Sequence, residues 1–331
     1  MLKSIAENGT PDERRSALAT LLVSERFRAR REIVAVFPLV TPAGEKRRTV
    51  FDAAHGTSLP GRLVRSEGQE DSGDAAVDEA YDGAGATYDL YLEVYGRNSI
   101  DDRGRRLDSS VHYDSGYDNA FWNGTQMVYG DGDGKLFGRF TAAPDVIGHE
   151  LTHGVTAHEA NLDYQDQPGA LNESISDVFG SLVKQRQLQQ TAIAADWLIG
   201  AGLFTKRVMG KALRSMEAPG TAYDDPVLGK DPQPAHMSEY VETADDDGGV
   251  HINSGIPNRA FFLVATAIGG FSWEKAGKIW YLALRDRFRK TTNFAQAAQL
   301  TAAVADELFG PTSREATAVR DAWGAVGIPA A

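Results

Sequence analysis

The sequence lacks cysteine altogether, and it lacks any apolar run of about eighteen residues, the length that a membrane-spanning helix requires. The missing cysteines exclude disulfide bonds and thiolate metal sites, but they do not select a cellular compartment. The N-terminus also lacks the apolar core of a secretory signal peptide. We therefore expect neither a membrane span nor a recognisable secretion signal.

Positive charge is scarce as well. The chain has 34 Lys and Arg against 46 Asp and Glu, which gives a formal net charge of −12. This balance argues against nucleic acid or an anionic membrane surface as a partner. The 331 residues are 42% hydrophobic, which is enough to bury a large core, and their number indicates two lobes.

The most informative stretch is His149-Glu150-Leu151-Thr152-His153. On a helix, residues four apart lie one above the other, so His149 and His153 can present two imidazoles to one metal ion. Imidazole pairs suit Zn²⁺, which then needs a third protein ligand and an open position for water. Glu150 can reach that water without binding the metal. The alternative interpretation is a chance match among the seven histidines of the chain.

A second segment, residues 169–177, supplies the missing ligand. Glu173 and Asp177 are again four residues apart, so a helix places both carboxylates on one face. We predict Glu173 as the third zinc ligand and Asp177 as the acceptor for the free ring N–H of a ligating histidine. The alternative is that both carboxylates only cap a helix and complement its dipole. The metal-binding helix just before them favours the ligand interpretation.

These motifs belong to a longer series of blocks in which the chain resembles the thermolysin-like neutral metalloproteases, an M4-type family of the gluzincin group. The blocks keep the family's order over roughly residues 50 to 330; they are residues 119–124, 128–134, 145–153, 164–177, 212–216 and 248–255. The short N-terminal segment and residues 190–204 resemble precursors of the protealysin type. The resemblance implies an α+β fold with a β-rich N-terminal lobe, a helical C-terminal lobe and the zinc helix between them. We expect a pro-segment over 1–31 and lobes over 32–161 and 162–331.

The resemblance also assigns roles around the zinc ion. It implies that Glu150 takes a proton from the attacking water and passes it to the departing amine. Tyr164 and His251 match donors that stabilise the oxyanion of a tetrahedral intermediate, and Asp246 matches the carboxylate that orients this histidine. Asn172 matches a residue in the outer shell of the metal site.

A cleft that binds extended peptide by strand addition is implied in the same way. Its predicted substrate contacts are Asn119, Ala120, Phe121, Trp122 and Arg214. The pocket for the residue after the scissile bond is matched by four apolar side chains, Phe137, Phe140, Val146 and Leu213. We therefore expect cleavage before Leu, Phe, Ile or Val, although each of these side chains by itself is more often part of a core.

Residues 1–31 differ in character from the rest. Thr10-Pro11-Asp12-Glu13 is a capping box with proline at the first helical position. Apolar residues then recur at helical spacing, and residues 26–31 are largely basic; the apolar set is Leu18, Leu21, Leu22 and Phe27. We interpret the segment as an amphipathic helix that docks on the body and is removed by cleavage in the basic stretch. The alternative is an extra helix that stays packed.

Further elements are predicted from periodicity and turn signals. Residues 33–37 and 48–51 predict a β-hairpin, and residues 75–95 predict a helix. Later helices are expected over 194–206, 258–269, 272–288, 294–309 and 315–324. His112 lies in a stretch of alternating polarity, and we interpret it as a satisfied core histidine rather than a ligand.

Calcium is the main departure from the family pattern. Thermolysin itself has a double calcium site with a carboxylate on the helix that follows the third zinc ligand. Here Asp145 is kept, but Lys184 occupies the matching carboxylate position. We expect a salt bridge in place of the ion, and little or no structural calcium.

Two functions remain open at this stage. The first is a secreted, monomeric zinc endopeptidase that acts on peptides and proteins and is processed from an inhibited precursor, with cytoplasmic retention of the precursor as an alternative. A proteinaceous inhibitor is a further candidate partner. The second is a non-catalytic peptide- or metal-binding module on the same fold, although Glu150, Tyr164 and His251 are all present.

Overall fold

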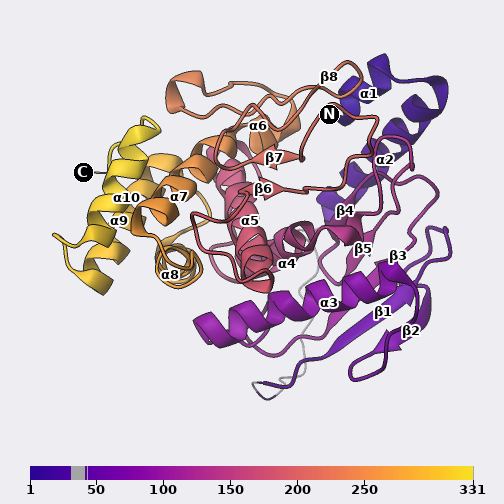
Figure 1. Ribbon diagram of the computed structural model, residues 1–331, viewed down its shortest axis with the longest axis horizontal. Helices are drawn as coiled ribbons and strands as arrows, with labels where there is room; N and C mark the ends of the chain where they lie inside the picture. Colours follow the sequence, from indigo (N-terminus) through magenta and orange to yellow (C-terminus); the bar gives the residue numbers. More distant parts are fainter. Residues whose placement is uncertain (31–41, 43, 331) are drawn as a thin grey trace.

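The computed structural model describes residues 1–30, 42 and 44–330, and of residues 25–30 only the backbone. A β-rich lobe and a helical lobe lie side by side, with two central helices between them (Figure 1). This arrangement confirms the predicted α+β class. No helix in the described parts of the chain combines the length and the hydropathy of a membrane span.

The N-terminal lobe is built on a five-stranded mixed sheet in the order β2-β1-β3-β5-β4. Its strands are β1 (Arg48–Asp52), β2 (Arg62–Ser66), β3 (Leu107–Val111), β4 (Ala120–Trp122) and β5 (Met127–Tyr129). Strands β1, β3 and β5 run parallel, whereas β2 and β4 pair antiparallel with β1 and β5. The carboxyl ends of the three parallel strands therefore meet at one edge of the sheet. Residues 33–37, the predicted hairpin partner of β1, lie outside the described residues.

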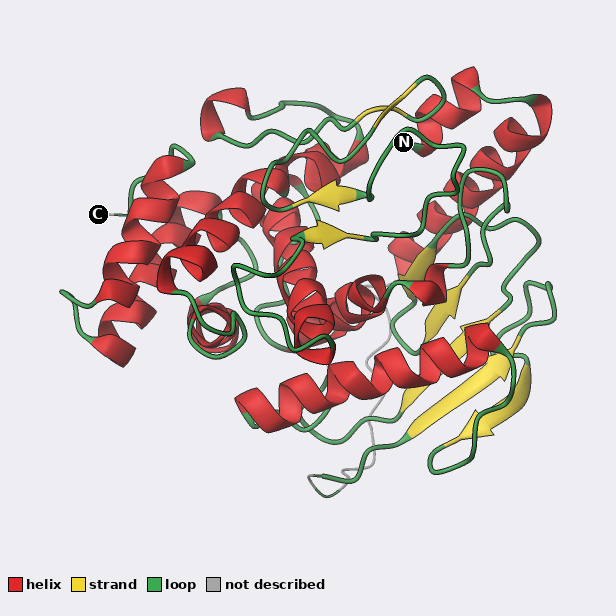
Figure 2. Cartoon of the chain, viewed as in Figure 1, coloured by secondary structure: helices red, strands yellow, loops and turns green. Residues whose placement is uncertain are grey.

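One face of this sheet is covered by α3 (Ala75–Asp89), which continues as the π-helical turn η1 (Leu90–Val94) (Figure 2). Asp74 caps α3, because its side chain accepts hydrogen bonds from the backbone N–H groups of Ala76 and Val77. The predicted helix over 75–95 is confirmed.

Two buried helices, α4 (Pro144–His158) and α5 (Asp166–Gln187), form the centre of the molecule. The two helices approach each other most closely at Gly148 of α4 and Gly180 of α5. A Cβ on Gly148 would lie 3.0 Å from Cα of Gly180, and a Cβ on Gly180 would lie 2.3 Å from the carbonyl oxygen of Asp145. The close approach therefore requires glycine at a helical position where glycine is otherwise unfavourable. It brings the histidine motif of α4 against the acidic face of α5.

The C-terminal lobe is helical. It contains α6 (Asp246–Asn253), α7 (Gly255–Ile268), α8 (Ala276–Leu282), η4 (Ala283–Arg287), α9 (Phe294–Phe309) and α10 (Arg314–Ala325). Short elements connect the layers: η2 (Phe140–Ala142), β6 (Leu198–Ile199), β7 (Arg214–Ser215), β8 (Asp224–Asp225), β9 (Gly229–Lys230) and η3 (Met237–Glu239). The helices predicted from residue 258 onward are confirmed, with ends that differ by a few residues.

The predicted helix over 194–206 is wrong. This stretch forms turns around β6, which pairs antiparallel with β7. Trp197, Gly200 and Gly202 have φ angles of 53°, 71° and 86°, which a right-handed helix does not contain. The Trp197 ring is buried, and its N–H donates to the Ala192 carbonyl at 2.8 Å. Trp197, Ile199 and Leu203 are thus buried by turns and not by one face of a helix.

The N-terminal segment forms α1 (Leu2–Asn8) and α2 (Pro11–Arg30). One half of the predicted capping box is present, since the N–H of Thr10 donates to Oε2 of Glu13 at 2.7 Å. The predicted docking face is wrong, because Leu18 and Leu22 are 52% and 61% exposed. Among the described side chains of α2, the buried ones are instead mostly polar and are Glu13, Ala17, Thr20 and Ser24. The side chain of Phe27 lies outside the described residues.

Candidate active site

The crossing of α4 and α5 brings three buried metal-binding side chains together, His149 and His153 from α4 and Glu173 from α5. Nε2 of His149 lies 3.1 Å from Nε2 of His153 and 3.3 Å from Oε2 of Glu173. Nε2 of His153 lies 3.4 Å from Oε1 of Glu173. Ligands at ~2.0–2.1 Å from a tetrahedral zinc ion are about 3.3 Å from one another. The cluster therefore has the composition and the spacing of a catalytic zinc site.

Each imidazole is held from behind by a second hydrogen bond. Nδ1 of His149 lies 2.8 Å from Oδ1 of Asp177, and Nδ1 of His153 lies 2.9 Å from Oδ1 of Asn172. Donation of the Nδ1 proton to these oxygens leaves Nε2 free to bind a metal. Arg214 in turn holds Asp177, with Nε and Nη2 at 2.8 Å and 2.7 Å from its two oxygens.

The carboxylates at the cluster favour a positive charge beside them. Oε2 of Glu173 is buried and has no hydrogen-bond partner among the described residues. Burial opposes a charge on His149, but its contacts with Asp177 and Glu173 outweigh burial and raise its pKa to about 10. Burial also opposes ionisation of Glu173, yet His251 and His153 hold its pKa well below the usual range. These residues therefore fit a divalent cation such as zinc.

Three predicted catalytic side chains surround this cluster. Glu150 lines the same cavity, and its Oε2 accepts the backbone N–H of Trp122 at 3.1 Å. The Tyr164 hydroxyl donates to Oε1 of Glu173 and lies 3.3 Å from Nε2 of His251. A carboxylate, a phenol and an imidazole thus line the cavity beside the metal cluster.

His251 is oriented by a tightly folded turn that includes Asp246. Oδ1 of Asp246 lies 2.6 Å from Nδ1 of His251, and Oδ2 accepts the backbone N–H of His251 at 2.8 Å. Positive φ angles at residues 246 to 249 turn the chain back on itself. Burial opposes ionisation of Asp246, but the neighbouring His251 lowers its pKa. Nε2 of His251 is therefore left to face the cavity.

The cavity extends from the metal cluster along β4. It is lined by seven of the predicted substrate-binding residues: Asn119, Ala120, Phe121, Phe140, Val146, Leu213 and Arg214. Trp122 and Phe137 are not among the described residues that line it. Trp122 offers its backbone N–H to Glu150, and buried Phe137 packs behind Phe140 with ring centroids 5.9 Å apart.

Sequence reasoning missed one lining residue, Ser24 of α2. Its hydroxyl lies 3.1 Å from the Tyr117 hydroxyl and accepts a hydrogen bond from Nδ2 of Asn119 at 3.2 Å. One turn earlier, Oγ1 of Thr20 accepts the backbone N–H of Asp118 at 3.1 Å. Helix α2 therefore covers the start of the strand predicted to bind peptide. No sequence signal marks these residues, because polar residues on a helix usually face solvent.

The N-terminal helices also contact the other side of the molecule. The ammonium of Lys3 lies 2.8 Å from Oδ1 of Asp245, and the Ser4 hydroxyl donates to the Val227 carbonyl at 2.9 Å. Residues 227 and 245 follow the central helices in the chain, whereas the contacts of Ser24 are with the N-terminal lobe. The segment therefore bridges the cleft.

Lys184 on α5 lies beside Asp145, at the position where the family pattern predicts a carboxylate ligand of calcium. Its ammonium lies 2.8 Å from Oδ2 of Asp145 and 2.9 Å from Oδ1 of Asp196, and it donates to the Leu198 carbonyl at 2.5 Å. Burial would lower the pKa of Lys184, but the two carboxylates outweigh it and raise the pKa. The expected salt bridge is present, whereas calcium binding itself stays a prediction.

Comparison with known proteins defines the class of this molecule. Residues 41–157 match the family model for the thermolysin metallopeptidase catalytic domain, and residues 160–328 match the model for its alpha-helical domain. The chain therefore belongs to the thermolysin family of metallopeptidases, as the sequence motifs predicted.

Individual relatives support the same assignment. The chain is 52% identical over 329 residues to an extracellular metalloprotease of Pectobacterium carotovorum subsp. carotovorum, covering 99% of this chain and 94% of the relative. It is 42% identical to a thermolysin of Alicyclobacillus acidocaldarius subsp. acidocaldarius, covering 84% of this chain and 50% of the relative. The solved precursor of protealysin from Serratia proteamaculans superposes with a TM-score of 0.91 at 54% identity and covers 99% of this chain and 97% of that chain. The predicted similarity to a precursor of this type is confirmed.

Proposed function

We propose that this metallopeptidase is a zinc endopeptidase that cleaves peptide bonds before Leu, Phe, Ile or Val. We also propose that residues 1–31 are a pro-segment, and that residues 32–161 and 162–331 form the two lobes of the catalytic body. One observation carries the proposal. The metal cluster, Glu150, His251 and Ser24 of α2 all line a single cavity.

The chemistry follows from what each side chain can do in that cavity. Zinc bound by His149, His153 and Glu173 would act as a Lewis acid on the substrate carbonyl and would acidify a water molecule. Glu150 accepts the proton of the attacking water and returns it to the departing amine, and no covalent acyl-enzyme is formed.

Two donors stabilise the charge that develops on the carbonyl oxygen. Tyr164 and His251 present a hydroxyl and an imidazole N–H to the oxyanion of the tetrahedral intermediate. Asp246 orients His251, because its carboxylate binds Nδ1 at 2.6 Å. Arg214 holds a substrate carbonyl beyond the cleavage point.

The preference for bulky apolar residues rests on the pocket. Phe140, Val146 and Leu213 contribute apolar side chains beside the metal cluster. An apolar side chain that leaves water there gains ~25 cal/mol per Å² of buried surface, whereas a charged one loses its hydration without a partner. Main-chain groups from Asn119 onward pair with extended peptide.

Inhibition of the precursor rests on the position of α2. Ser24 engages the Asn119 amide, so a peptide cannot use this group while α2 is docked. Cleavage in the basic stretch 26–31 releases the segment. We propose secretion of the mature enzyme, since relatives from Pectobacterium and Serratia marcescens are named extracellular metalloproteases.

The non-catalytic alternative predicts bound zinc and bound peptide without turnover. A set of quenched peptides that differ only at the residue after a central glycine tests both ideas. We expect hydrolysis of the Leu, Phe, Ile and Val peptides, little of the Asp and Lys peptides, and none by Glu150→Gln. Equal hydrolysis of the Asp peptide would refute the specificity, and zinc binding without any hydrolysis would favour the binding module.

A further inference from the structure

A second group of metal-binding side chains lies at the edge of the sheet where the three parallel strands end. His55 follows β1, His112 directly follows β3, and Asp131 lies two residues beyond β5. Because β1, β3 and β5 run parallel and adjacent, their carboxyl ends deliver these three side chains to one place. The residues are far apart in the sequence and form no motif. The register of the sheet alone brings them together.

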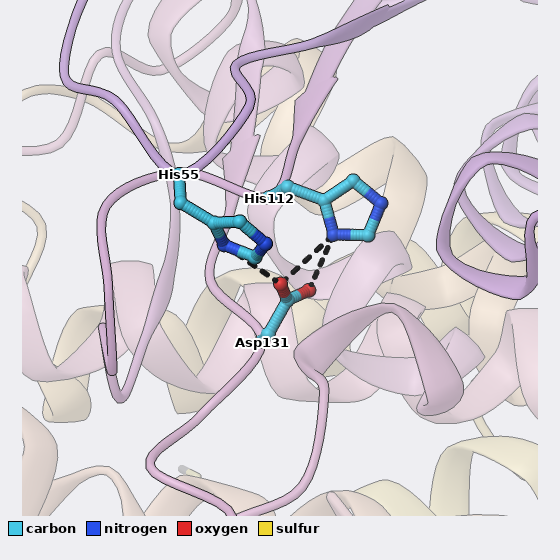
Figure 3. A group of neighbouring side chains, drawn as sticks. All are labelled: His55, His112 and Asp131. Carbon is cyan, nitrogen blue, oxygen red and sulfur yellow. Dashed lines mark hydrogen bonds and ion pairs between the residues drawn. The ribbon is translucent and has the colours of Figure 1, made fainter.

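The ligand atoms of this group already converge. Nδ1 of His112 lies 2.8 Å and 3.0 Å from the two carboxylate oxygens of Asp131, and Nδ1 of His55 lies 3.5 Å from Oδ2 of the same residue. All three ligand atoms lie within 4.8 Å of one another. Figure 3 shows both rings directed at the carboxylate between them. The contacts of His112 and His55 with Asp131, at 2.8 Å and 3.5 Å, bracket the spacing of about 3.3 Å expected around a tetrahedral ion.

Asp74 completes the outer shell. Its Oδ2 lies 3.0 Å from Nε2 of His112, while its other oxygen caps α3 by accepting the backbone N–H of Ala76 at 2.9 Å. A carboxylate that accepts the Nε2 proton leaves Nδ1 of His112 free to coordinate an ion, the arrangement in which outer-shell partners fix the tautomer of a metal ligand. The same relation holds between Asp177 and His149 in the active site, with the two ring nitrogens exchanged.

The backbone holds the two histidines in place. The N–H of His55 donates to the carbonyl of His112 at 2.8 Å, so the loops after β1 and β3 are joined at the ligands themselves. Both residues have positive φ angles, 58° and 54°, which cost energy in residues other than glycine. The exposed side of His55 leaves room for water to complete the coordination.

We propose that His55, His112 and Asp131 bind a divalent transition-metal ion of the Zn²⁺ type, at a site separate from the catalytic cluster. Two imidazoles and one carboxylate suit zinc, nickel, cobalt or copper, whereas calcium and magnesium prefer oxygen ligands. The carboxylates of Asp131 and Asp74 give the site the negative charge that attracts a cation.

The ion would hold the loop that supports the cleft. Asp131 adjoins Gly130, whose N–H donates to the Asn119 carbonyl at 3.0 Å and whose carbonyl accepts the Phe140 N–H at 3.1 Å. Asn119 and Phe140 both line the catalytic cavity. The second site would thus hold the strand-end loops beside the substrate cleft. One residue, Gly130, connects its ligand Asp131 to the residues that line the cavity.

Metal counting tests this proposal independently of activity. The full chain is prepared with Glu150→Gln to prevent self-digestion, stripped of metal, incubated with a small excess of Zn²⁺ and freed of unbound ion by gel filtration. We compare this parent with His55→Asn, His112→Asn and His149→Ala, and with His236→Asn as a matched histidine control. Asparagine tolerates positive φ, so the first two variants keep the loop conformation. Circular dichroism and thermal unfolding verify that each variant is folded.

We expect about two zinc equivalents in the parent and in His236→Asn, and about one in His55→Asn, His112→Asn and His149→Ala. With Co²⁺, His55→Asn should lose the part of the visible absorption that comes from the second site. His149→Ala should lose the part that comes from the catalytic site and keep the other. Ca²⁺ should not occupy the site. One equivalent in the folded parent would overturn the proposal, and so would two equivalents in both asparagine variants, since the second ion would then lie elsewhere.

Discussion

Replacement of Lys184 by methionine tests how the molecule is held together at the position where calcium is expected in relatives. The Lys184 side chain is only 8% exposed, and Asp145 beside it is 1% exposed. Methionine keeps most of the volume and removes the charge, so the buried carboxylate loses its ammonium partner at 2.8 Å. Within the described part of the chain, only the backbone N–H groups of Val146 and Gly200, at 2.9 Å and 3.2 Å, still donate to it.

The expected cost is that of an uncompensated buried charge, about 3–5 kcal/mol of unfolding free energy. A change of this size should lower the midpoint of thermal unfolding by roughly 4–7 °C. The assay is thermal unfolding of the Glu150→Gln protein at fixed zinc. The exposed pair between Lys275 and Glu315 supplies the control, since Lys275→Met should cost less than about 1 kcal/mol.

Lys184→Glu adds the calcium arm of the experiment. It places a third carboxylate beside Asp145, Asp196 and the Leu198 carbonyl, all oxygen ligands of the kind that calcium prefers. We expect calcium to raise the unfolding midpoint of this variant and to leave the parent unchanged. The reasoning is refuted if Lys184→Met costs no more than Lys275→Met, or if calcium stabilises the parent as strongly as the variant.

Three further predictions concern the cleft. Glu150→Gln should keep its catalytic zinc but lose at least about 10²-fold in kcat, measured with the Gly-Leu peptide; near-normal turnover would remove Glu150 from the mechanism. Leu213→Ala should raise kcat/KM for Phe relative to Val substrates by roughly tenfold, because one pocket wall retreats; an unchanged ratio would place the specificity elsewhere. Burial, reinforced by Asp133, raises the pKa of Asp118 to about 7 beneath α2. The docked form therefore holds a proton that the open form releases, so raising the pH towards 7 should speed loss of the N-terminal segment by up to about tenfold per pH unit, with no further gain well above pH 7. Asp118→Asn should flatten that profile, and an unaltered profile would assign it to another group.

The sequence predicted the site residues best where two of them lie on the same helix at a fixed spacing. The ligand pairs of α4 and α5 follow from residues four apart, and the family blocks add the partners of each ligand. Prediction failed where tertiary contact decides. Leu18 and Leu22 suggested an apolar docking face, but both are exposed. Helix α2 instead presents Thr20 and Ser24 to polar partners and Val23 to a small aromatic cluster.

Two other misses have different physical causes. The predicted helix over 194–206 does not form, because Trp197, Gly200 and Gly202 adopt positive φ angles in turns around β6. His112 was interpreted as a satisfied core histidine. Both its ring nitrogens are satisfied, by Asp131 and Asp74, but the residue lies half-buried at a strand end, where it shares Asp131 with His55. Residues brought together only by the register of parallel strands leave no periodic trace in the sequence, so this cluster required the structure.

The central claim is that one zinc-dependent cavity hydrolyses peptides once α2 has left it. The most direct measurement follows hydrolysis of a quenched Gly-Leu peptide by the purified full chain, with N-terminal sequencing of the protein at each time point and a parallel sample with a zinc chelator. The account predicts that activity rises as the N-terminal ~30 residues disappear and stops when zinc is removed. Full chelator-sensitive activity with Met1 still in place would contradict the inhibitory role of α2, and activity that persists without zinc would contradict the account as a whole.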